Sequence, residues 1–385
     1  MDIYVVRPGD SVDSIAAAFG VAAEELIYAN QLLYPYRLAI GQAMLVPGVP
    51  GIEPFGRAAA NNGYAYPFID NDILRESLRY LSELSIFSYG FGFDGAPVMP
   101  ALDESWMIEA AREADVRPIL TLTPFGPDGN FNNYLISSVL RDAAARERLL
   151  NELAAIVSNK GYDGIDVDFE YILAEDRDLF TQFVADLAEL MHRQGKTLSV
   201  AMAPKTSADQ PGLLYEGMDY AALGAVADYV LIMTYEWGYT YSPPQPVAPL
   251  NWMRRVLDYA VSEIPPEKID LGIANYAYDW TLPYVQGESK ARSFGVVEAM
   301  RLAADTGAEI MFDEVAASPY FNYRQDGVQH EVWFEDVRSF AAKFGLIEEY
   351  GLRGGGWWQI MRLFRAGFLL ADHLFDIVKT EFPEA

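Results

Sequence analysis

A short stretch at residues 163–171 alternates apolar and acidic side chains. The alternating residues are Ile165, Val167 and Phe169 on the apolar side, and Asp166, Asp168 and Glu170 on the acidic side. Because successive side chains of a β-strand point to opposite faces, this pattern predicts a strand with one apolar and one acidic face. Neighbouring carboxylates on that face would lie roughly 7 Å apart and repel one another. At least one of them is therefore expected to hold its proton above its ordinary pKa.

Beyond residue 57, strand-like and helix-like segments alternate to the end of the chain. The predicted strands are 63–68, 84–91, 117–123, 163–171, 198–203, 229–235, 269–276 and 352–360. Such alternation predicts an α/β fold, a (β/α)8 TIM barrel, with a doubly wound open sheet as the alternative. Active sites of barrels lie at the C-terminal ends of the strands. Glu170 and Tyr235, at the ends of the fourth and sixth strands, are therefore expected to face the same mouth.

Residues 291–335 interrupt this alternation after the seventh strand. They contain a predicted helix at 296–306, a predicted strand at 309–313 and a hairpin that turns at Asp326-Gly327. The Asp-Gly dipeptide is a frequent hairpin turn. We expect a small α+β insertion that forms one wall of the cleft.

Residues 1–48 are predicted to form a small module that precedes the barrel. Its elements follow the order β-α-α-β: a strand at 4–7, helices at 14–19 and 22–30, and a strand at 44–47. Residues 49–56 are rich in Pro and Gly and are expected to act as a linker. The barrel domain then spans residues 57–385.

Composition narrows the possible functions. The formal net charge of −27 disfavours binding to nucleic acid or to anionic membranes. The chain has no Cys and only three scattered His, so neither disulfides nor a zinc site are expected, and no cofactor is indicated. It has no apolar run of about 18 residues and no visible secretory signal, so synthesis in the cytoplasm is expected.

Two other interpretations of the acidic stretch stay open. One is a solvated edge strand, although the apolar face and the flanking glycines favour a buried strand. The other is a carboxylate cage for Mg²⁺ or Ca²⁺. A carboxyl of raised pKa beside an ionised one is, in contrast, what acid-assisted cleavage of a glycosidic bond requires. A phosphate loop at 354–356 is excluded, because these glycines lack the Lys-Ser/Thr of that motif.

The whole motif Asp163-x-x-Asp166-x-Asp168-x-Glu170 resembles the signature of glycoside hydrolase family 18, the chitinase-like hydrolases. The resemblance implies that Glu170 is the general acid. It also implies that the nucleophile is the substrate's own 2-acetamido oxygen. Asp168 would orient that acetamide, Asp166 would share its proton, and Tyr235 would hydrogen-bond the acetamide oxygen.

The same resemblance implies further residues that bind substrate. These are Asp163, Met233, Glu236 and Trp358. Trp358 matches the tryptophan beneath the sugar at the cleavage site, and alternation predicts that Trp357 points the other way. Glu236 stands where many members have Asp, and Ala274 and Ala277 depart from the usual pattern of the seventh strand.

The N-terminal module resembles a LysM domain, a binder of N-acetylglucosamine polymers. The matching residues include Tyr4, Val6, Gly9-Asp10-Ser11, Asn30, Leu38, Gly41-Gln42 and Val46-Pro47. The resemblance implies a glycan site between two loops, formed by Gly9, Asp10 and Ser11 and by Leu38, Ala39 and Ile40. A capping subdomain without a ligand is the alternative.

The combination of module and barrel resembles the spore-coat and cortex-lytic N-acetylglucosaminidases of spore-forming bacteria. The strings at 233–238, 278–284 and 332–336 carry this likeness. It implies a retaining β-N-acetylglucosaminidase, located at the spore coat, cortex or cell wall, that acts on peptidoglycan or chitin-like chains. A non-catalytic, lectin-like coat protein is the alternative, and the presence of Glu170 favours the enzyme.

Overall fold

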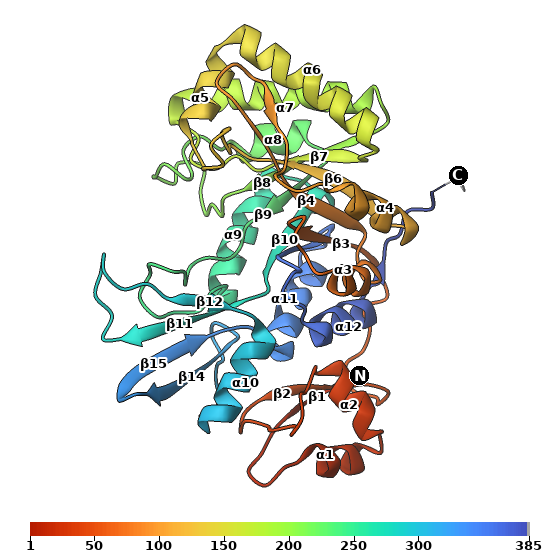
Figure 1. Ribbon diagram of the computed structural model, residues 1–385, viewed down its shortest axis with the longest axis vertical. Coiled ribbons are helices and arrows are strands. Elements are labelled where there is room, and N and C mark those ends of the chain that lie inside the picture. Colours follow the sequence, from red (N-terminus) through yellow and green to blue (C-terminus); the bar gives the residue numbers. More distant parts are fainter. Residues whose placement is uncertain (383–385) are drawn as a thin grey trace.

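The fold is given by a computed structural model that describes residues 1–382 (Figure 1). Its centre is a closed barrel of parallel strands, in which β4 pairs with β3 to complete the ring. In order around the barrel the strands are β3 (Ala58–Ala65), β4 (Glu83–Phe91), β6 (Arg117–Leu122), β7 (Gly164–Val167), β8 (Thr197–Met202), β9 (Tyr229–Ile232), β10 (Ile269–Ala274) and β16 (Gly354–Trp358). The (β/α)8 prediction is therefore confirmed, and the open sheet is excluded.

Helices surround the barrel and bury their apolar faces against it. They are α3 (Asn71–Leu78), α4 (Ser105–Glu113), α5 (Tyr134–Arg141), α6 (Ala143–Lys160), α7 (Arg177–His192), α8 (Tyr220–Val226), α9 (Leu250–Glu263), α11 (Val337–Glu349) and α12 (Arg365–Leu374). The smaller elements are the strands β5 (Pro97–Val98) and β17 (Asp376–Ile377) and the 3-10 turns η1 (Ala174–Asp176) and η2 (Pro266–Lys268). Helix α6 shows how local sequence sets the bounds. Asp142 accepts hydrogen bonds from the first free N–H groups, and Gly161 ends the helix at φ 81°.

Strand β7, which carries the acidic stretch, is shorter than predicted. It ends at Val167, so Asp168 and Glu170 lie beyond it in the loop. The predicted alternation persists there, because Phe169 is buried and stacks on Phe180 and Phe183 of α7 at 5.8 and 5.7 Å between ring centroids. Strand β9 likewise ends at Ile232, before Tyr235.

The first barrel strand begins five residues before its predicted start, at Ala58 instead of residue 63. The sequence there contains Asn61 and Asn62, which are unfavourable in strands. Both are buried and bonded: Asn61 donates to the carbonyl of Tyr80 at 2.7 Å, and Asn62 donates to Ser85 at 3.0 Å. Tertiary hydrogen bonds therefore override the local propensity.

The insertion is a separate antiparallel sheet with one helix. Its strand order is β12 (Arg292–Phe294), β11 (Ala277–Leu282), β15 (Val328–Trp333), β14 (Ser318–Gln325) and β13 (Met311–Asp313), and its helix is α10 (Val296–Thr306). The predicted helix and hairpin are present. However, β11 pairs with β15 and belongs to this sheet, so the insertion begins at Ala277 and not at residue 291.

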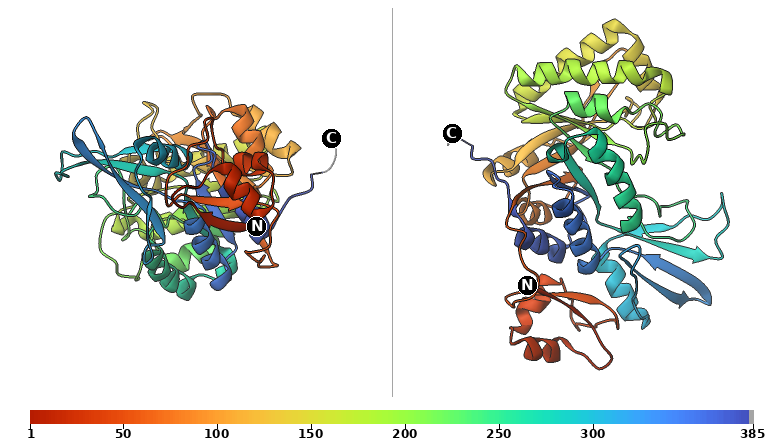
Figure 2. Two further views of the ribbon diagram at one scale, coloured as in Figure 1. Left: turned by 90° about the horizontal axis from the view of Figure 1, so that it is seen from below. Right: turned by 180° about the vertical axis from the view of Figure 1, so that it is seen from behind.

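The N-terminal module has the predicted βααβ order and lies at one end of the molecule, beside the insertion (Figures 1 and 2). Its elements are β1 (Asp2–Val5), α1 (Val12–Phe19), α2 (Ala23–Ala29) and β2 (Ala43–Val46). Strand β2 is apolar on both faces. Met44 is buried in the core of the module, whereas Leu45 is buried in the core that the module shares with the barrel.

The connecting segment is fixed in place and does not behave as the expected linker. The N–H of Ile52 donates to the carbonyl of Met1 at 2.7 Å, and that of Phe55 donates to Leu374 at 2.9 Å. The Phe55 ring also contacts Phe375, with centroids 5.1 Å apart. The module and the barrel therefore form one packed body.

We predict that Leu45→Ala destabilises the whole chain, because it removes a side chain from the shared core. The expected loss is about 2–5 kcal/mol in the free energy of unfolding. This loss is measured by urea unfolding that is monitored with tryptophan fluorescence and with circular dichroism. Both probes should report one transition. Met44→Ala, on the opposite face of the same strand, is the matched control for the core of the module alone. Two separate transitions in the wild-type chain would contradict the shared core.

Candidate active site

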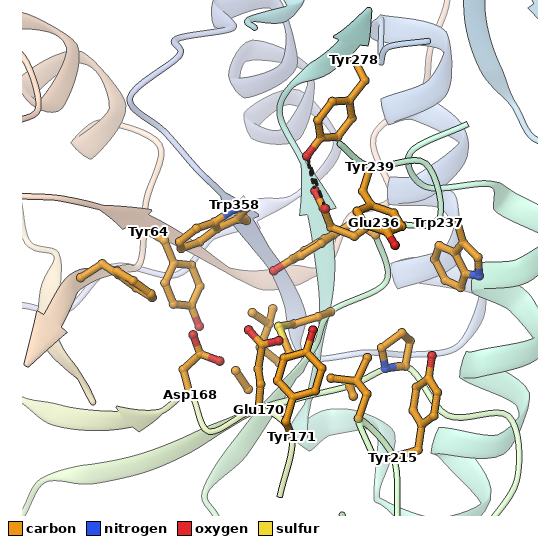
Figure 3. Close-up of a pocket in the computed structure, with 18 residues that line it drawn as sticks. Tyr64, Asp168, Glu170, Tyr171, Tyr215, Glu236, Trp237, Tyr239, Tyr278 and Trp358 are labelled. Carbon is orange, nitrogen blue, oxygen red and sulfur yellow. Dashed lines mark hydrogen bonds between the residues drawn. The ribbon is translucent and has the colours of Figure 1, made fainter. Parts of the chain in front are cut away.

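A cavity of about 660 Å³ opens at the C-terminal ends of the barrel strands (Figure 3). The predicted residues that line it are Asp168, Glu170, Met233, Tyr235, Glu236 and Trp358. Trp357 points the other way, as alternation predicted: it is fully buried, and its ring lies 4.6 Å from that of Phe368. The structure therefore brings together six of the predicted site residues at one mouth.

Asp166 lies beneath the cavity and is completely buried. Its carboxylate accepts hydrogen bonds from the hydroxyls of Tyr64 at 2.9 Å and Ser199 at 2.7 Å. Burial raises the pKa of Asp166 to about 6, against the opposing effect of these two hydrogen bonds. Asp166 is thus held in place below the residues that reach the cavity.

Asp168 lies between Asp166 and the cavity. Its Oδ1 is buried and has no hydrogen-bond partner among the described residues. Burial is the main cause that raises the pKa of Asp168 well above its ordinary value, followed by the charges of Glu170 and Asp166. The sequence pattern attributed the raised pKa to mutual repulsion, whereas desolvation is the larger cause. Burial and the neighbouring charges therefore both favour the protonated form of this cluster.

Glu170 points into the cavity from the loop after β7 (Figure 3). Burial raises its pKa, and the neighbouring charge of Glu236 raises it further. The sequence had assigned this electrostatic effect to Asp166 and Asp168. Glu236, in the loop after β9, is the charge that raises the pKa of Glu170, and the charge of Glu170 in turn raises the pKa of Asp168.

Two tyrosines that the sequence analysis did not identify as site residues hold Glu236. The hydroxyl of Tyr276 donates to Oε1 of Glu236 at 2.7 Å, and that of Tyr278 donates to the same atom at 3.0 Å. Glu236 has a left-handed backbone, with φ 67°, which turns its side chain toward them. These hydrogen bonds favour the ionised form of Glu236, although burial raises its pKa overall.

Tyr235 lines the cavity with only 9% of its surface exposed. Space for its ring comes from Gly272 of β10, because a Cβ atom at that position would lie 2.8 Å from the ring. Burial raises the pKa of the Tyr235 phenol well above its ordinary value, so its hydroxyl remains a hydrogen-bond donor. The glycine is a signal in the sequence that could have located this ring.

Asp163 does not belong to the site, contrary to the prediction. It precedes β7 at the opposite end of the barrel from the mouth. Its carboxylate forms ion pairs with Lys196 at 2.6 Å and with Arg112 at 2.9 Å. Asp163 therefore joins neighbouring strands and helices and cannot reach a substrate in the cavity.

Other residues of the cavity were missed because only the closed barrel brings them together. They are Tyr64, Phe87, Tyr171, Tyr215, Trp237 and Tyr239. Tyr64 and Phe87 lie in β3 and β4, Tyr171 and Tyr215 follow β7 and β8, and Trp237 and Tyr239 both follow β9, so no single local motif contains them all. Their rings surround the carboxylates, and such rings can stack on the apolar faces of sugars.

The predicted glycan loops of the module are partly occupied by internal contacts. Asp10 accepts hydrogen bonds from the Tyr4 hydroxyl and from the N–H of Arg7, both at 2.7 Å. In the same loop, which also contains Gly9, Ser11 caps the N-terminus of helix α1. Ala39 is buried in the core that the module shares with the rest of the chain, so its side chain cannot contact a glycan as predicted.

The neighbours of Ala39 face different surroundings. Leu38 is partly buried in the core of the module, and the carbonyl of Ile40 accepts a hydrogen bond from Ile310 at 2.8 Å. The Ile40 side chain remains exposed. This loop therefore offers less surface to a glycan than the sequence predicted.

Within residues 1–382, no group of three or more His, Asp or Glu side chains is arranged to hold a metal ion. The carboxylate cage considered for Asp166, Asp168 and Glu170 would require such a group. No helix of the described chain is long and apolar enough to cross a bilayer.

A closed (β/α)8 barrel whose mouth holds buried carboxyls of raised pKa among aromatic rings is the arrangement expected of a glycoside hydrolase that uses acid catalysis. Residues 121–362 match the family described as glycosyl hydrolases family 18, and the chain belongs to this family. Residues 4–47 match the LysM domain. The chain thus combines a hydrolase barrel with a module of a family that binds N-acetylglucosamine-containing glycans.

The chain is similar to several known proteins, in two of the three cases below over nearly its whole length. The chain is 37% identical to the cortical fragment-lytic enzyme of Bacillus subtilis, and the match covers 99% of this chain and 100% of the relative. The crystal structure of the spore cortex-lytic enzyme SleL of Bacillus megaterium superposes with a TM-score of 0.93 at 32% identity, over 99% of both chains. A chitinase of Chromobacterium violaceum matches 82% of this chain and 98% of its own, with a TM-score of 0.76 at 27% identity.

We predict that replacing both Tyr276 and Tyr278 by Phe lowers the pKa of Glu170. Without the two O–H donors the ionised form of Glu236 is less stable, so its own pKa rises. A Glu236 that carries less negative charge then raises the pKa of Glu170 less. Carboxyl ¹³C NMR titration measures both groups.

Tyr239→Phe is the matched control, because Tyr239 lines the same cavity but gives Glu236 no hydrogen bond. This variant should leave both pKa values unchanged. An unchanged Glu170 titration in the double variant would show that Glu236 does not influence the acid.

Proposed function

We propose that the protein is a retaining β-N-acetylglucosaminidase that cleaves spore-cortex peptidoglycan by substrate-assisted catalysis. The observation that carries this proposal is the buried group of Asp166, Asp168 and Glu170, whose pKa values are all raised, beside Tyr235 at the barrel mouth. The names of the relatives, which refer to cortex lysis, support the choice of substrate.

In the first step, Glu170 gives its proton to the glycosidic oxygen while the acetamide oxygen of the substrate attacks the anomeric carbon. The bond to the leaving sugar breaks, and a cyclic oxazolinium ion forms. Asp168 accepts a hydrogen bond from the acetamide N–H and balances the positive charge. The Tyr235 hydroxyl donates to the acetamide oxygen and fixes its direction of attack.

In the second step, water attacks the same carbon and gives a proton to the Glu170 carboxylate. The oxazolinium ring opens, and the β configuration is retained. The unpaired Oδ1 of Asp168 is free to accept the acetamide N–H, since Asp166 is already held by Tyr64 and Ser199. This division of roles follows from which carboxylates reach the cavity.

The rings that surround the carboxylates suit a chain of amino sugars. Trp358 forms one wall, and Tyr171, Tyr215 and Tyr239 lie on the other side of Glu170 (Figure 3). We place the protein at the spore cortex or cell wall on the basis of its relatives. A glycan-holding protein without turnover is the alternative, and the access of Glu170 to the cavity favours the enzyme.

Mass spectrometry of products distinguishes these functions. Purified cortex muropeptides and chitin oligomers are incubated side by side with the full chain. Cleavage of the cortex material with N-acetylglucosamine at the new reducing end is expected. Cleavage of chitin alone would identify chitin-like chains, and not cortex peptidoglycan, as the substrate. The absence of products from both would favour the glycan-holding alternative.

We predict that Glu170→Gln folds normally and loses about 10²–10⁴-fold in kcat, because the amide keeps the shape but has no proton to give. Turnover of a soluble fragment measures the loss, and thermal unfolding checks the fold. Glu175→Gln, an exposed residue in the segment that follows, is the matched control and should retain activity. Activity near the wild-type value in Glu170→Gln would overturn the role of the acid.

We also predict full activity in excess EDTA, together with an activity that falls on the alkaline side. The acid must be protonated to work, and its pKa is raised, so activity is present below that pKa and is lost as the pH rises through it. The alkaline limb reports the coupled carboxyls as a group.

A thiazoline mimic of the oxazolinium ion should inhibit strongly, because enzymes bind such analogues more tightly than substrate. Activity that is lost in EDTA and restored by Mg²⁺ or Ca²⁺, without thiazoline inhibition, would instead indicate a metal mechanism.

A further inference from the structure

A second cavity, of about 320 Å³, lies between the N-terminal module and the insertion. One wall is the segment between α2 and β2 of the module, and the other is one face of helix α10. The helix contributes Val297, Met300, Arg301 and Asp305, which the spacing of three and four residues places on one side. We call this cavity the interdomain crevice. It lies outside the barrel mouth. None of the predicted glycan-binding residues at 9–11 and 38–40 lines it, although its module wall is the segment that contains residues 38–40.

The walls of the crevice are held at a fixed separation. At one end of the module segment, the N–H of Arg365 donates to the side chain of Gln31 at 2.7 Å. At the other end, Gly41 lies so close to the carbonyl of Ile310 that an added Cβ atom would be 2.0 Å from its oxygen. Arg338 donates to the Gly41 carbonyl at 3.2 Å. The crevice is therefore a permanent feature of the packed chain.

The rim of the crevice combines an exposed aromatic ring with arginines. The side chain of Tyr34 is 85% exposed and that of Leu33 is 58% exposed, although both lie on a segment whose ends are fixed. Leu33 and Tyr34 are neighbours in the chain and both line the crevice, so a ligand in the crevice would contact their apolar surface. A tyrosine ring of this kind offers a flat face for stacking on a sugar.

The charge of the crevice is opposite to that of the whole chain. The net charge of the protein is −27, yet the crevice holds Arg37 and Arg301 against a single acid, Asp305. Arg37 pairs with Asp305 at 3.3 Å, whereas Arg301 is exposed and forms no ion pair within residues 1–382. An unpaired guanidinium favours a carboxylate ligand.

We propose that the interdomain crevice binds the carboxylate-bearing sugars of a peptidoglycan strand, with a pyranose ring on Tyr34 and a carboxylate at Arg301. This site rests on the proposed function for the source of its ligand. A volume of about 320 Å³ suits about one sugar unit and its substituent. Because both walls belong to one packed body, a strand held here has a fixed orientation relative to the catalytic cleft.

The test uses the methionine methyl groups as reporters in the full chain carrying Glu170→Gln, which prevents turnover. Met300 lines the crevice and Met233 lines the catalytic cavity. Soluble muropeptide oligomers with free carboxylates are added stepwise to the protein, whose methionine methyl groups carry ¹³C, and the NMR signals of these methyl groups are followed. Uncharged chitin oligomers form the second arm. We expect the Met300 signal to shift saturably with the muropeptides and at least about tenfold more weakly with chitin oligomers.

Three variants sharpen the test. Tyr34→Ala and Arg301→Gln should each weaken the Met300 response by about tenfold or more, while the Met233 response stays unchanged. Tyr34→Phe should keep the response, since it retains the stacking face. Arg324→Gln, an exposed arginine on the distant β14–β15 hairpin, is the matched charge control and should have no effect.

The outcomes separate this site from the proposed enzymatic function. A Met300 signal that does not move, or that moves equally in all variants, overturns the crevice site even if cortex is cleaved. The same holds if the shift depends on protein concentration alone, which would identify a second copy of the chain as the occupant. A specific Met300 response without cleavage of cortex by the wild-type chain would leave the site standing and overturn the enzyme.

Discussion

The constraint on which the site depends is that carboxyls are buried at the barrel mouth without a cation to balance them. None of the residues that line the catalytic cavity is Lys or Arg. The cations of the barrel interior lie at its other end, where Arg117 and Arg353 bond Glu83, and Arg353 also bonds Asp270. A buried charge must be paired or neutralised. No side-chain cation is at hand to neutralise the upper carboxyls, and burial raises the pKa of Glu170, which favours the protonated acid that can donate.

Because the arginines lie at the other end of the barrel, the carboxyls near the mouth depend on other partners. The number of these partners falls from the buried Asp166 outward to Glu170. Asp166 is fixed by two hydroxyl donors, Asp168 keeps one oxygen free, and Glu170 faces the open space. Each step toward the cavity has fewer protein partners and more access to a ligand. Glu236, supported by Tyr276 and Tyr278, adds negative charge from the opposite wall without adding a donor of its own.

Local alternation in the sequence was sufficient to predict the barrel and the acidic side chains that begin in its fourth strand and continue into the loop after it. This alternation did not predict residues outside the strands, or residues from distant parts of the chain that only the fold brings together. Asp163 matches the motif, yet its position before β7 places it at the far end of the barrel. The tyrosines that hold Glu236 were not predicted because they lie about forty residues away in the chain, Tyr276 directly before the insertion and Tyr278 in its first strand.

The docking of the N-terminal module onto the barrel was likewise not predicted, although the sequence of β2 contains a signal for it. Strand β2 has four buried residues in succession, and a continuous apolar run indicates a strand covered on both faces. One face covers the helices of the module, and the other must meet a second apolar surface, which α11 and α12 of the barrel supply. The Pro/Gly composition of residues 49–56 suggested freedom that this packing removes. The module cannot move away from the barrel, so any glycan that it holds approaches the cleft in one orientation. A flexible tether would instead spread the local concentration of the glycan over many directions.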